Sequence, residues 1–358
     1  MKNILFIIQF DSFIKTLLPT MRDLAEDGYV LDVFLLKKRF KKKWITEEIL
    51  SLFNSIESKL NSFVMNYEGN AIKMIKKNNY ELIVVGTSNT RLILNIKKNL
   101  HKKAITTKIA SGYVGALLNN DFKSFQKGLK RRSETDLIWL PGSNAKKMID
   151  KLNIIDYNKT KLIDTGLPRF DKLYKLQKNF KENKRDSIIF FEQPTFPESK
   201  KEREILVEQL INIANLNPKL NVIIKPRFKK KVGHAHRPKY LLQDILQKKK
   251  KPINISISNE DIYDLFQKCK MALTISSTAG LESLLVNIPT YFITDFCGTT
   301  NKYGSNDFNL INATTTFDDI FKNKLPKIKY NEVNNILRFD GNNTKRLSNA
   351  FKKIIANE

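Results

Sequence analysis

The chain has 358 residues, of which 41% are hydrophobic, and its 63 Lys and Arg against 36 Asp and Glu give a formal net charge of +27. This length predicts about two globular domains, and the apolar fraction excludes a disordered or collagen-like chain. The two cysteines, Cys269 and Cys297, lie in no metal-ligand or redox spacing. A disulfide framework, structural zinc and thiol redox chemistry are therefore excluded.

Short apolar runs alternate with segments of helical period from the first residues onward. The run at 4–8 is followed by Gln9 and Asp11 and by no small-residue cleavage site, so it predicts a buried strand rather than a signal peptide. Strands are expected at 4–9, 30–36, 82–85, 187–191, 221–224, 271–275 and 290–293. Helices are expected at 13–26, 72–77, 89–99, 201–214, 238–246, 260–267 and 279–286. This alternation predicts an α/β fold with two doubly wound parallel sheets.

A Gly-Leu-Pro turn at 166–168 and a polar segment at 177–185 separate the two series of strands. We therefore expect four regions and a last helix at 343–355. The regions are an N-terminal domain (1–165), a linker (166–186), a C-terminal domain (187–310) and a C-terminal helical segment (311–358). Nowhere are there ~18 consecutive apolar residues, so we expect no transmembrane helix and a cytoplasmic protein.

Basic residues are clustered at 37–43, 97–103, 127–132 and 248–251, and Trp44 directly follows the first cluster. Such charge suits nucleic acid, an anionic membrane surface or a phosphorylated substrate. Nucleic acid is disfavoured because no zinc-finger or RNP-type aromatic motif accompanies the dispersed clusters. Basic groups beside an aromatic residue favour peripheral binding to the anionic inner face of the cytoplasmic membrane. Ordinary solvated surface charge explains any single lysine equally well.

The stretch 271–283 predicts a strand that ends at Ile275, a turn of small hydroxyl residues and a helix from about Ala279. The hydroxyls are those of Ser276, Ser277 and Thr278. Backbone N–H groups and the positive end of the helix dipole face the carboxyl end of the sheet at such a turn, which predicts a phosphate cradle. The alternative is that Ser277 or Thr278 only caps the helix, as Ser and Thr commonly do.

A second strand-to-helix connection, at 224–238, is strongly basic. It contains two of the three histidines among six Lys and Arg, with Pro238 expected at the first helical position. The candidate ligand-binding residues are Lys225, Arg227, His234, His236 and Arg237. Cationic surroundings lower the pKa of histidine unless an anion compensates, so we expect a site for phosphate or carboxylate. A divalent metal is disfavoured because no carboxylate or thiolate is nearby. A helix-capping His236 in a solvated basic loop remains the alternative.

These motifs resemble those of a known class of enzymes. His-Arg-Pro at 236–238, followed by strand-Ser-Ser-Thr-helix, resembles bacterial glycosyltransferases of the GT-B fold that use CMP-activated sugars, notably sialyltransferases and Kdo transferases. The segment 165–171 resembles the Gly-x-Pro-Arg-x-Asp segment of teichoic-acid CDP-glycerol transferases. Asp-Ser-Phe at 11–13 and Thr-Asp-Phe at 294–296 add similarity to a family of polysaccharide glycosyltransferases.

The resemblance implies a GT-B fold, in which two Rossmann-like domains face each other across a cleft. The N-terminal domain would bind the acceptor and the C-terminal domain the nucleotide-sugar. His236 and Arg237 would contact the donor phosphate or an adjacent carboxylate, and the residues 276–278 would contact the phosphate. Glu282 would accept hydrogen bonds from ribose hydroxyls, unless it is an ordinary surface glutamate. An Arg separates His236 from Pro238, whereas many sialyltransferases have the pair adjacent, which weakens the inference for the histidine.

A catalytic base is expected from the first domain. Asp11 follows the first strand, where a carboxylate could take the proton of an acceptor hydroxyl. Its alternative role, shared with Ser12, is to cap the helix that begins near Phe13. Glu192, next to Gln193, ends the first strand of the second domain and is a second candidate carboxylate. Asp11 and His236 are thus the candidate catalytic residues.

The segment 109–116 is rich in glycine but lacks the spacing of a nucleotide-binding loop, and we expect it to shape the acceptor side. Because no Asp-x-Asp occurs in the chain, we expect no metal and no cofactor, with cations and a helix dipole stabilising the leaving phosphate.

The predicted function is transfer of a sugar from a nucleotide donor, most favourably a CMP-linked ulosonic acid, to a surface polysaccharide or lipid-linked oligosaccharide. A CDP-alditol phosphotransferase of teichoic-acid-like polymer synthesis and a non-catalytic nucleic-acid-binding protein are the alternatives.

Overall fold

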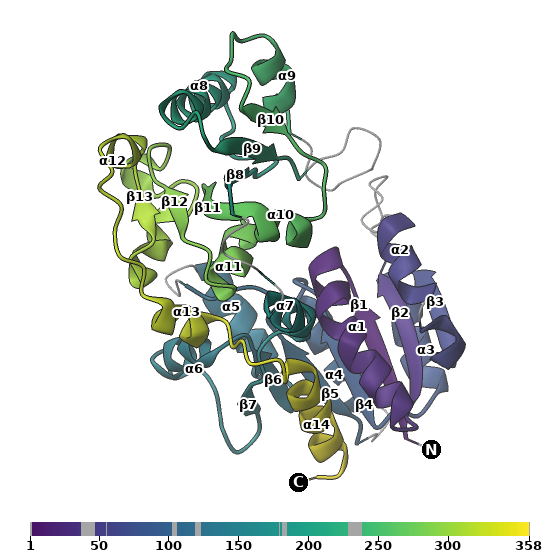
Figure 1. Cartoon of the computed structure of the whole chain (residues 1–358). Coiled ribbons are helices and arrows are strands. Elements are labelled where there is room, and N and C mark those ends of the chain that lie inside the picture. The colour runs from purple at the N-terminus through teal and green to yellow at the C-terminus, as the bar shows by residue number, and fades with distance from the viewer. Residues whose placement is uncertain are drawn as a thin grey trace. The chain divides into compact units, whose positions relative to one another are not determined.

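The computed structural model describes residues 2–36, 47–54, 56–101, 106–118, 123–178, 180, 185–227 and 238–357. The chain folds into two compact units (Figure 1). Unit 1 comprises Met1–Lys175 and Asn335–Glu358, and unit 2 comprises Leu176–Asn334. The C-terminal 24 residues of the chain therefore belong to unit 1, together with its N-terminal half.

Unit 1 contains a seven-stranded sheet with the spatial order β3-β2-β1-β4-β5-β6-β7 and with all neighbouring strands parallel. The strands are β1 (Asn3–Ile8), β2 (Val30–Leu36), β3 (Ser62–Asn66), β4 (Leu82–Gly86), β5 (Lys108–Gly112), β6 (Leu137–Leu140) and β7 (Lys161–Asp164). The strand order reverses between β1 and β4, so their carboxyl ends form the switch point of a doubly wound sheet.

Helices cover both faces of this sheet, which explains why its central strands are apolar without alternation. Side chains of β1 point alternately to the two faces: Ile4, Phe6 and Ile8 join one core, and Leu5 and Ile7 join the other. The first core is covered by α1 (Asp11–Glu26), α2 (Glu47–Asn54) and α14 (Asn343–Ile355). The second core is covered by α3 (Glu68–Lys77) and α4 (Arg91–His101), and α5 (Lys123–Arg132) and α6 (Ser143–Asp150) pack on β6.

Unit 2 repeats the same logic with six parallel strands in the order β10-β9-β8-β11-β12-β13. The strands are β8 (Ser187–Phe191), β9 (Asn221–Lys225), β10 (Ile255–Ile257), β11 (Cys269–Thr274), β12 (Thr290–Ile293) and β13 (Thr314–Thr315). The helices include α8 (Lys200–Leu216), α9 (Leu242–Gln247), α10 (Ile262–Lys268), α11 (Thr278–Leu285) and α12 (Phe317–Phe321). Here the switch point lies between β8 and β11, and the order is that of the dinucleotide-binding fold.

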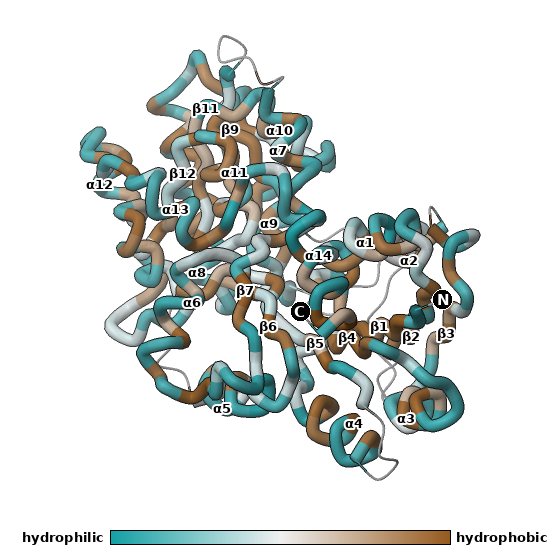
Figure 2. The backbone as a smooth tube through the Cα atoms, turned by 90° about the horizontal axis from the view of Figure 1, so that it is seen from below, coloured by the Kyte–Doolittle hydropathy of each residue, from teal (hydrophilic) through white to brown (hydrophobic). Residues whose placement is uncertain are grey.

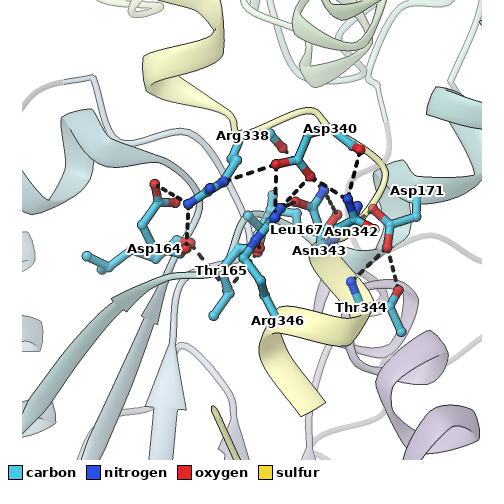
Figure 3. A network of polar contacts seen from close by, with 12 residues as sticks. Asp164, Thr165, Leu167, Asp171, Arg338, Asp340, Asn342, Asn343, Thr344 and Arg346 are labelled. Atoms are coloured by element: carbon cyan, nitrogen blue, oxygen red, sulfur yellow. Dashed lines mark hydrogen bonds and ion pairs between the residues drawn. The ribbon is translucent and has the colours of Figure 1, made fainter. Parts of the chain in front are cut away.

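A network of polar contacts in unit 1, which we call the C-terminal clasp, joins the chain before α14 to the segment that follows β7 (Figure 3). Its charged members are Asp164, Asp171, Arg338, Asp340 and Arg346. Asp171 accepts hydrogen bonds from the backbone N–H groups of Asn343 (3.1 Å) and Thr344 (2.7 Å). Because Asp171 thereby satisfies N–H groups at the start of α14, the Gly-x-Pro-Arg-x-Asp segment has a structural role.

The fold class expected from the sequence is confirmed: two doubly wound parallel sheets are present. The last helix has the expected bounds, Asn343–Ile355. One local expectation is wrong. The helix expected from Pro238 begins only at Leu242, because the chain before it is anchored through the Tyr240 carbonyl, which accepts a hydrogen bond from Arg203. Part of the segment expected as a linker is helical, in a 3-10 turn at Pro168–Phe170 and in α7 (Asp171–Gln177).

The hydropathy of the chain follows the layers of each unit. In Figure 2 the strands β1, β2 and β4 are largely hydrophobic, whereas α4 alternates between hydrophobic and hydrophilic residues. Among the described residues, no helix has both the length and the apolar character that a membrane span requires.

Candidate functional site

The carboxyl ends of β8 and β11 lie side by side at the switch point of unit 2, and hydroxyl groups tie them together. The two strands pair in parallel up to Phe191 and Thr274. Thr274 Oγ1 donates to the Phe191 carbonyl (2.8 Å) and accepts from the backbone N–H of Ser277 (3.2 Å). One buried threonine thus fixes the turn that follows β11 to the end of the neighbouring strand.

The turn from β11 to α11 is held by further hydrogen bonds. Ser305 Oγ donates to the Ile275 carbonyl (2.8 Å), and Gln193 Nε2 donates to the Ser276 carbonyl (2.7 Å). Ser277 is the N-cap residue of α11, and its buried side chain accepts from the Ala279 N–H (3.3 Å). Both bonded carbonyls are held from outside the turn, so the turn has little freedom to change shape.

Gly280 allows α11 to lie directly on the sheet. A Cβ atom at this position would come within 2.8 Å of Thr274 and 3.1 Å of Phe292. The N-terminus of α11 is therefore held against the carboxyl edge of β11, where a helix dipole attracts anions. Of the expected phosphate-binding hydroxyls, those of Ser276 (half-buried) and Thr278 (exposed) are accessible, whereas Ser277 is occupied with capping.

Glu192 has a structural environment rather than a catalytic one. Its side chain is 2% exposed and forms an ion pair of 2.8 Å with Arg203, whose side chain is 1% exposed. Burial raises the pKa of Glu192, and the hydrogen bond and charge of Arg203 oppose that rise. Arg203 also donates to four backbone carbonyls, those of Gln193, Pro194, Pro197 and Tyr240. Since a buried pair of this kind cannot reach a substrate, Glu192 is not retained as a candidate base.

The other residues predicted in unit 2 lie at the end of β9 and on α11. Lys225 is the half-buried last residue of β9 and pairs with Phe191 at the end of β8, and Arg227 is exposed two residues further on. Glu282 is half-buried in the second turn of α11. Three predicted residues, His234, His236 and Arg237, lie outside the described residues. Lys225 is thus next to the switch point, at the edge where the turn into α11 begins.

In unit 1, Asp11 lies at the corresponding position after β1. The connection has only two residues, Gln9 and Phe10, and Asp11 is the first, half-buried residue of α1. Phe10 is the N-cap residue with φ 74° and ψ 143°, a backbone conformation that costs a non-glycine residue about 1–3 kcal/mol. The Phe10 cap makes no side-chain hydrogen bond. The alternative role of Asp11 or Ser12 as the N-cap of this helix is therefore wrong, because the strained Phe10 occupies that position.

Two functional candidates near Asp11 were not apparent in the sequence. Thr87, directly after β4, donates through Oγ1 to Gln9 Oε1 (2.8 Å) and so connects the two strands of the switch point. Arg132, in the basic run 127–132, is only 6% exposed although the run was expected to be surface charge. Neither has a local sequence signal, because the burial of Arg132 and the partner of Thr87 depend on residues more than 20 positions away.

The chemistry available at the two edges differs. Unit 2 offers hydroxyl groups, a helix N-terminus and the basic residues Lys225 and Arg227, all suited to an anionic phosphate. Unit 1 offers the carboxylate of Asp11, which is suited to accept a proton. Within the described parts of the chain, no group of three or more His, Cys, Asp or Glu side chains could hold a metal ion.

Several solved structures are similar to this chain in fold. The UDP-GlcNAc 2-epimerase from Neisseria meningitidis, bound to UDP-GlcNAc, has a TM-score of 0.61 and 12% identity, with 98% of this chain and 100% of that chain covered. MurG from Acinetobacter baumannii has a TM-score of 0.57 and 10% identity, with 99% and 100% covered. An H444N variant of the wall teichoic acid polymerase TagF has a TM-score of 0.56 and 11% identity, with 99% and 89% covered. These likenesses show that the two units form a GT-B fold.

The sequence comparisons give the family. No curated protein matches the chain. Residues 4–331 match the family described as "Putative glycosyltransferase (DUF6716)", a span that includes both sheets and every residue discussed at their carboxyl edges. The chain belongs to this glycosyltransferase family.

Proposed function

We propose that the protein transfers a sugar from a nucleotide-activated donor to a hydroxyl group of a surface polysaccharide or lipid-linked oligosaccharide. The observation that carries the proposal is the turn from β11 to α11, where a switch point, a pair of serines and a helix N-terminus coincide. Open α/β sheets bind phosphorylated ligands at this position. Membership of a glycosyltransferase family supports the reaction class.

In this proposal unit 2 binds the donor and stabilises its leaving phosphate. The hydroxyls of Ser276 and Thr278 and the N-terminus of α11 donate hydrogen bonds to phosphate oxygens, and Lys225 and Arg227 add positive charge. Donors that are already oriented stabilise developing negative charge without the cost of reorganisation. Glu282 accepts from the ribose. His234, His236 and Arg237 remain sequence predictions for the same phosphate.

Unit 1 binds the acceptor, and Asp11 acts as the general base. Its carboxylate accepts the proton of the acceptor hydroxyl as that oxygen attacks the anomeric carbon, and the bond from this carbon to the donor phosphate breaks. A positioned base of this kind contributes about 10²–10⁴-fold to a reaction rate. The short, strained turn at Phe10 supports the assignment because it holds Asp11 at the edge of the sheet.

The nucleotide is the finer part of the proposal. The motifs at 236–238 and 276–278 favour CMP, which would make the donor a CMP-linked ulosonic acid. The Neisseria meningitidis epimerase of similar fold binds UDP-GlcNAc, which favours UDP. Because the candidate phosphate site serves either nucleotide, we propose a nucleotide-sugar donor without choosing between CMP and UDP. Measurements of nucleotide binding identify which nucleobase the protein prefers.

A thermal-shift series with CMP, CDP, UDP, UMP, GDP and ADP, each with and without EDTA, tests the proposal. A ligand present at about 100 times its dissociation constant adds roughly 2.7 kcal/mol to the free energy of unfolding. We expect selective stabilisation by CMP or UDP that EDTA leaves unchanged. A folded protein that no nucleotide stabilises would contradict the donor site.

A CDP-alditol phosphotransferase is the second candidate, and the similarity in fold to the wall teichoic acid polymerase TagF favours it. It would use the same phosphate site, but the acceptor hydroxyl would attack phosphorus. Stabilisation by CDP with little effect of CMP, followed by turnover of CDP-glycerol rather than of CMP-sugars, would move the assignment to this reaction.

We further propose that the protein acts at an anionic membrane surface. Lys127 and Lys130 are exposed on α5, and Lys98 is exposed on α4. Each basic residue near such a surface contributes about 1 kcal/mol of attraction. Cosedimentation with anionic vesicles, lost with neutral vesicles and at high salt, is the expected result.

A further inference from the structure

Arg132 is a buried cation that lacks a carboxylate partner among the described residues. It is the last residue of α5 and is 6% exposed. Desolvation lowers the pKa of its guanidinium, and the neighbouring Tyr113 opposes that effect. A buried charge is ordinarily paired with an opposite charge, because the loss of hydration is otherwise uncompensated. The described part of the chain therefore leaves the charge of Arg132 without a counter-charge.

The contacts that Arg132 makes are weak. Its guanidinium lies 4.5 Å from the centroid of the Tyr113 ring, and Nη2 donates to the Thr87 carbonyl over 3.4 Å. Its buried Nε–H has no hydrogen-bond partner among the residues that the structure describes. A guanidinium carries five N–H donors in a fork that fits carboxylate and phosphate. An anion arriving here would find donors that the protein does not use.

The surroundings of Arg132 favour an anion. Thr87 and Tyr113 directly follow β4 and β5, so the guanidinium lies at the carboxyl edge of the sheet. The loop after β4 leads into the N-terminus of α4, a helix of 11 residues, and its Ser88 is exposed. Arg131 Nη1 donates to Thr90 Oγ1 (3.3 Å) in the same loop. Two arginines and the positive end of a helix dipole thus meet at one loop.

Among the described residues, no carboxylate forms an ion pair with Arg131 or Arg132. Glu68, which contacts this loop, accepts hydrogen bonds from the side chains of Asn89 (3.4 Å) and Asn95 (3.0 Å) instead. Thr87, whose carbonyl binds Arg132, also binds Gln9 through its hydroxyl (2.8 Å), two residues before Asp11. The group around Arg132 is therefore connected by hydrogen bonds to the turn that holds the proposed base.

We propose that Arg132, with Arg131 and the N-terminus of α4, binds an anionic group of the acceptor. The inference rests on the proposed function and adds a substrate class to it: the acceptor carries a phosphate or a carboxylate. Binding that group at Arg132 anchors the acceptor on unit 1 while one of its hydroxyls reaches Asp11. A phosphorylated lipid carrier and an acidic glycan are the two sources of this charge.

Isothermal titration of the full chain with inorganic phosphate and with glucuronate tests the proposal. Arg132→Gln is compared with the wild type and with Lys73→Gln, which removes an exposed charge from α3 of the same unit. We expect Arg132→Gln to weaken binding of one anion roughly 10- to 100-fold, since a hydrogen bond to a charged group has about this effect. Lys73→Gln should bind as the wild type does. Loss of phosphate binding indicates a phosphorylated acceptor, and loss of glucuronate binding a carboxylated one.

Binding of CMP and UDP, measured in the same variants, separates this inference from the donor proposal. If the wild type binds neither nucleotide but Arg132→Gln still loses an anion, the donor proposal fails and the anion site remains. Nucleotide binding that weakens with the anion in Arg132→Gln overturns the assignment to the acceptor. Unchanged anion binding in Arg132→Gln, equal loss in Lys73→Gln, or no anion binding by the wild type overturns the site.

If Arg132→Gln does not fold, Arg132→Lys tests the site instead. This variant keeps the positive charge but lacks the forked set of N–H donors of the guanidinium. A several-fold loss of anion affinity in that folded variant supports the site, and wild-type affinity overturns it.

Discussion

Two buried arginines, one in each unit, show how differently the same residue can be used at the carboxyl edge of a sheet. Arg203 in unit 2 is bonded to Glu192 and to four backbone carbonyls, the longest of these bonds being 3.1 Å. Arg132 in unit 1 has one carbonyl at 3.4 Å and the face of Tyr113. A buried guanidinium with all its partners in the protein stabilises the fold, whereas one without them is available to a ligand.

The same contrast applies to the carboxylates of the two edges. Glu192 follows the first strand of unit 2 and is held in a buried ion pair with Arg203. Asp11 follows the first strand of unit 1 and lies half-buried at the start of a long helix. Both units have the strand order of the dinucleotide-binding fold. The topology supplies two equivalent positions, and the function we propose gives phosphate binding to the one in unit 2 and proton transfer to the one in unit 1.

The largest effect is expected from Asp11→Asn. If Asp11 is the base, as we propose, its loss should lower turnover by about 10²–10⁴-fold. Nucleotide affinity should stay at the wild-type value, because the proposed donor site is in unit 2. Steady-state kinetics and thermal shifts with nucleotide measure both. The matched control is Glu26→Gln, at the other end of α1, which should leave turnover intact. Wild-type turnover in Asp11→Asn would show that unit 1 has another base.

Glu192→Ala should affect stability rather than chemistry. It leaves Arg203 buried without a counter-charge, which costs about 3–5 kcal/mol of the free energy of unfolding. Arg132→Met leaves no buried carboxylate without its ion-pair partner, so it should lower the free energy of unfolding far less. Denaturant unfolding measures both, with the exposed pair partner Glu208→Ala as a control that should have little effect. Equal losses in Glu192→Ala and Arg132→Met would remove the distinction between the two arginines.

Two serines in unit 2 are helix caps, and comparing their alanine variants distinguishes a capping role from a role in ligand binding. Ser199 caps α8 in a capping box and Ser277 caps α11. Either change to Ala should cost about 1 kcal/mol of stability. Only Ser277→Ala should also weaken nucleotide binding, because its loss disturbs the turn at the proposed phosphate site. Titration calorimetry on both variants tests this, and equal nucleotide affinities would mean that Ser277 serves only as a cap.

The smallest expected effect is a local loss of stability at low pH. Burial tends to raise the pKa of Asp23, but hydrogen bonds from Lys345 and Ser348 and the charges of Lys345 and Lys352 outweigh it and hold that pKa below its ordinary value. Asp340 has a lowered pKa for the same kind of reason, with Arg346 as its main partner. A depressed pKa stabilises the fold above about pH 4, and this contribution is lost as the pH falls through the folded value.

We therefore expect α14 to loosen from unit 1 below about pH 4, before α4, a helix of the same unit that contains no acidic residue. Hydrogen exchange of α14, compared with α4 over a pH series, measures it. Asp23→Asn at pH 7 should reproduce part of the effect. Equal protection of the two helices throughout the series would contradict the expectation.

Sequence reasoning predicts the elements well wherever a strand is apolar on both faces. The runs at 4–9, 187–191 and 271–275 follow from burial under helices on both sides, and the helix at 343–355 follows from its apolar period. It also finds the turn after β11, where local residue types carry the signal.

The partners of charged side chains are what local reasoning misses. Glu192 and Arg132 look like accessible groups in the sequence, and their burial depends on contacts with other elements. The membership of α14 in unit 1 likewise depends on Asp171, more than 170 positions before it. Neither a hydrophobic period nor a motif contains that information.

The C-terminal clasp makes unit 2 an insertion within unit 1. The chain leaves unit 1 after Lys175 and returns at Asn335, and Phe351 of α14 packs on Phe6 and Trp139 in the core. A gene fragment that ends at residue 334 therefore encodes a unit 1 with an uncovered core. Residues 176–334, by contrast, are one contiguous cassette. A chimera meant to exchange the proposed donor specificity should replace residues 176–334 and keep both segments of unit 1. Joining an N-terminal half to a foreign C-terminal half would remove α14 from the unit whose core it covers.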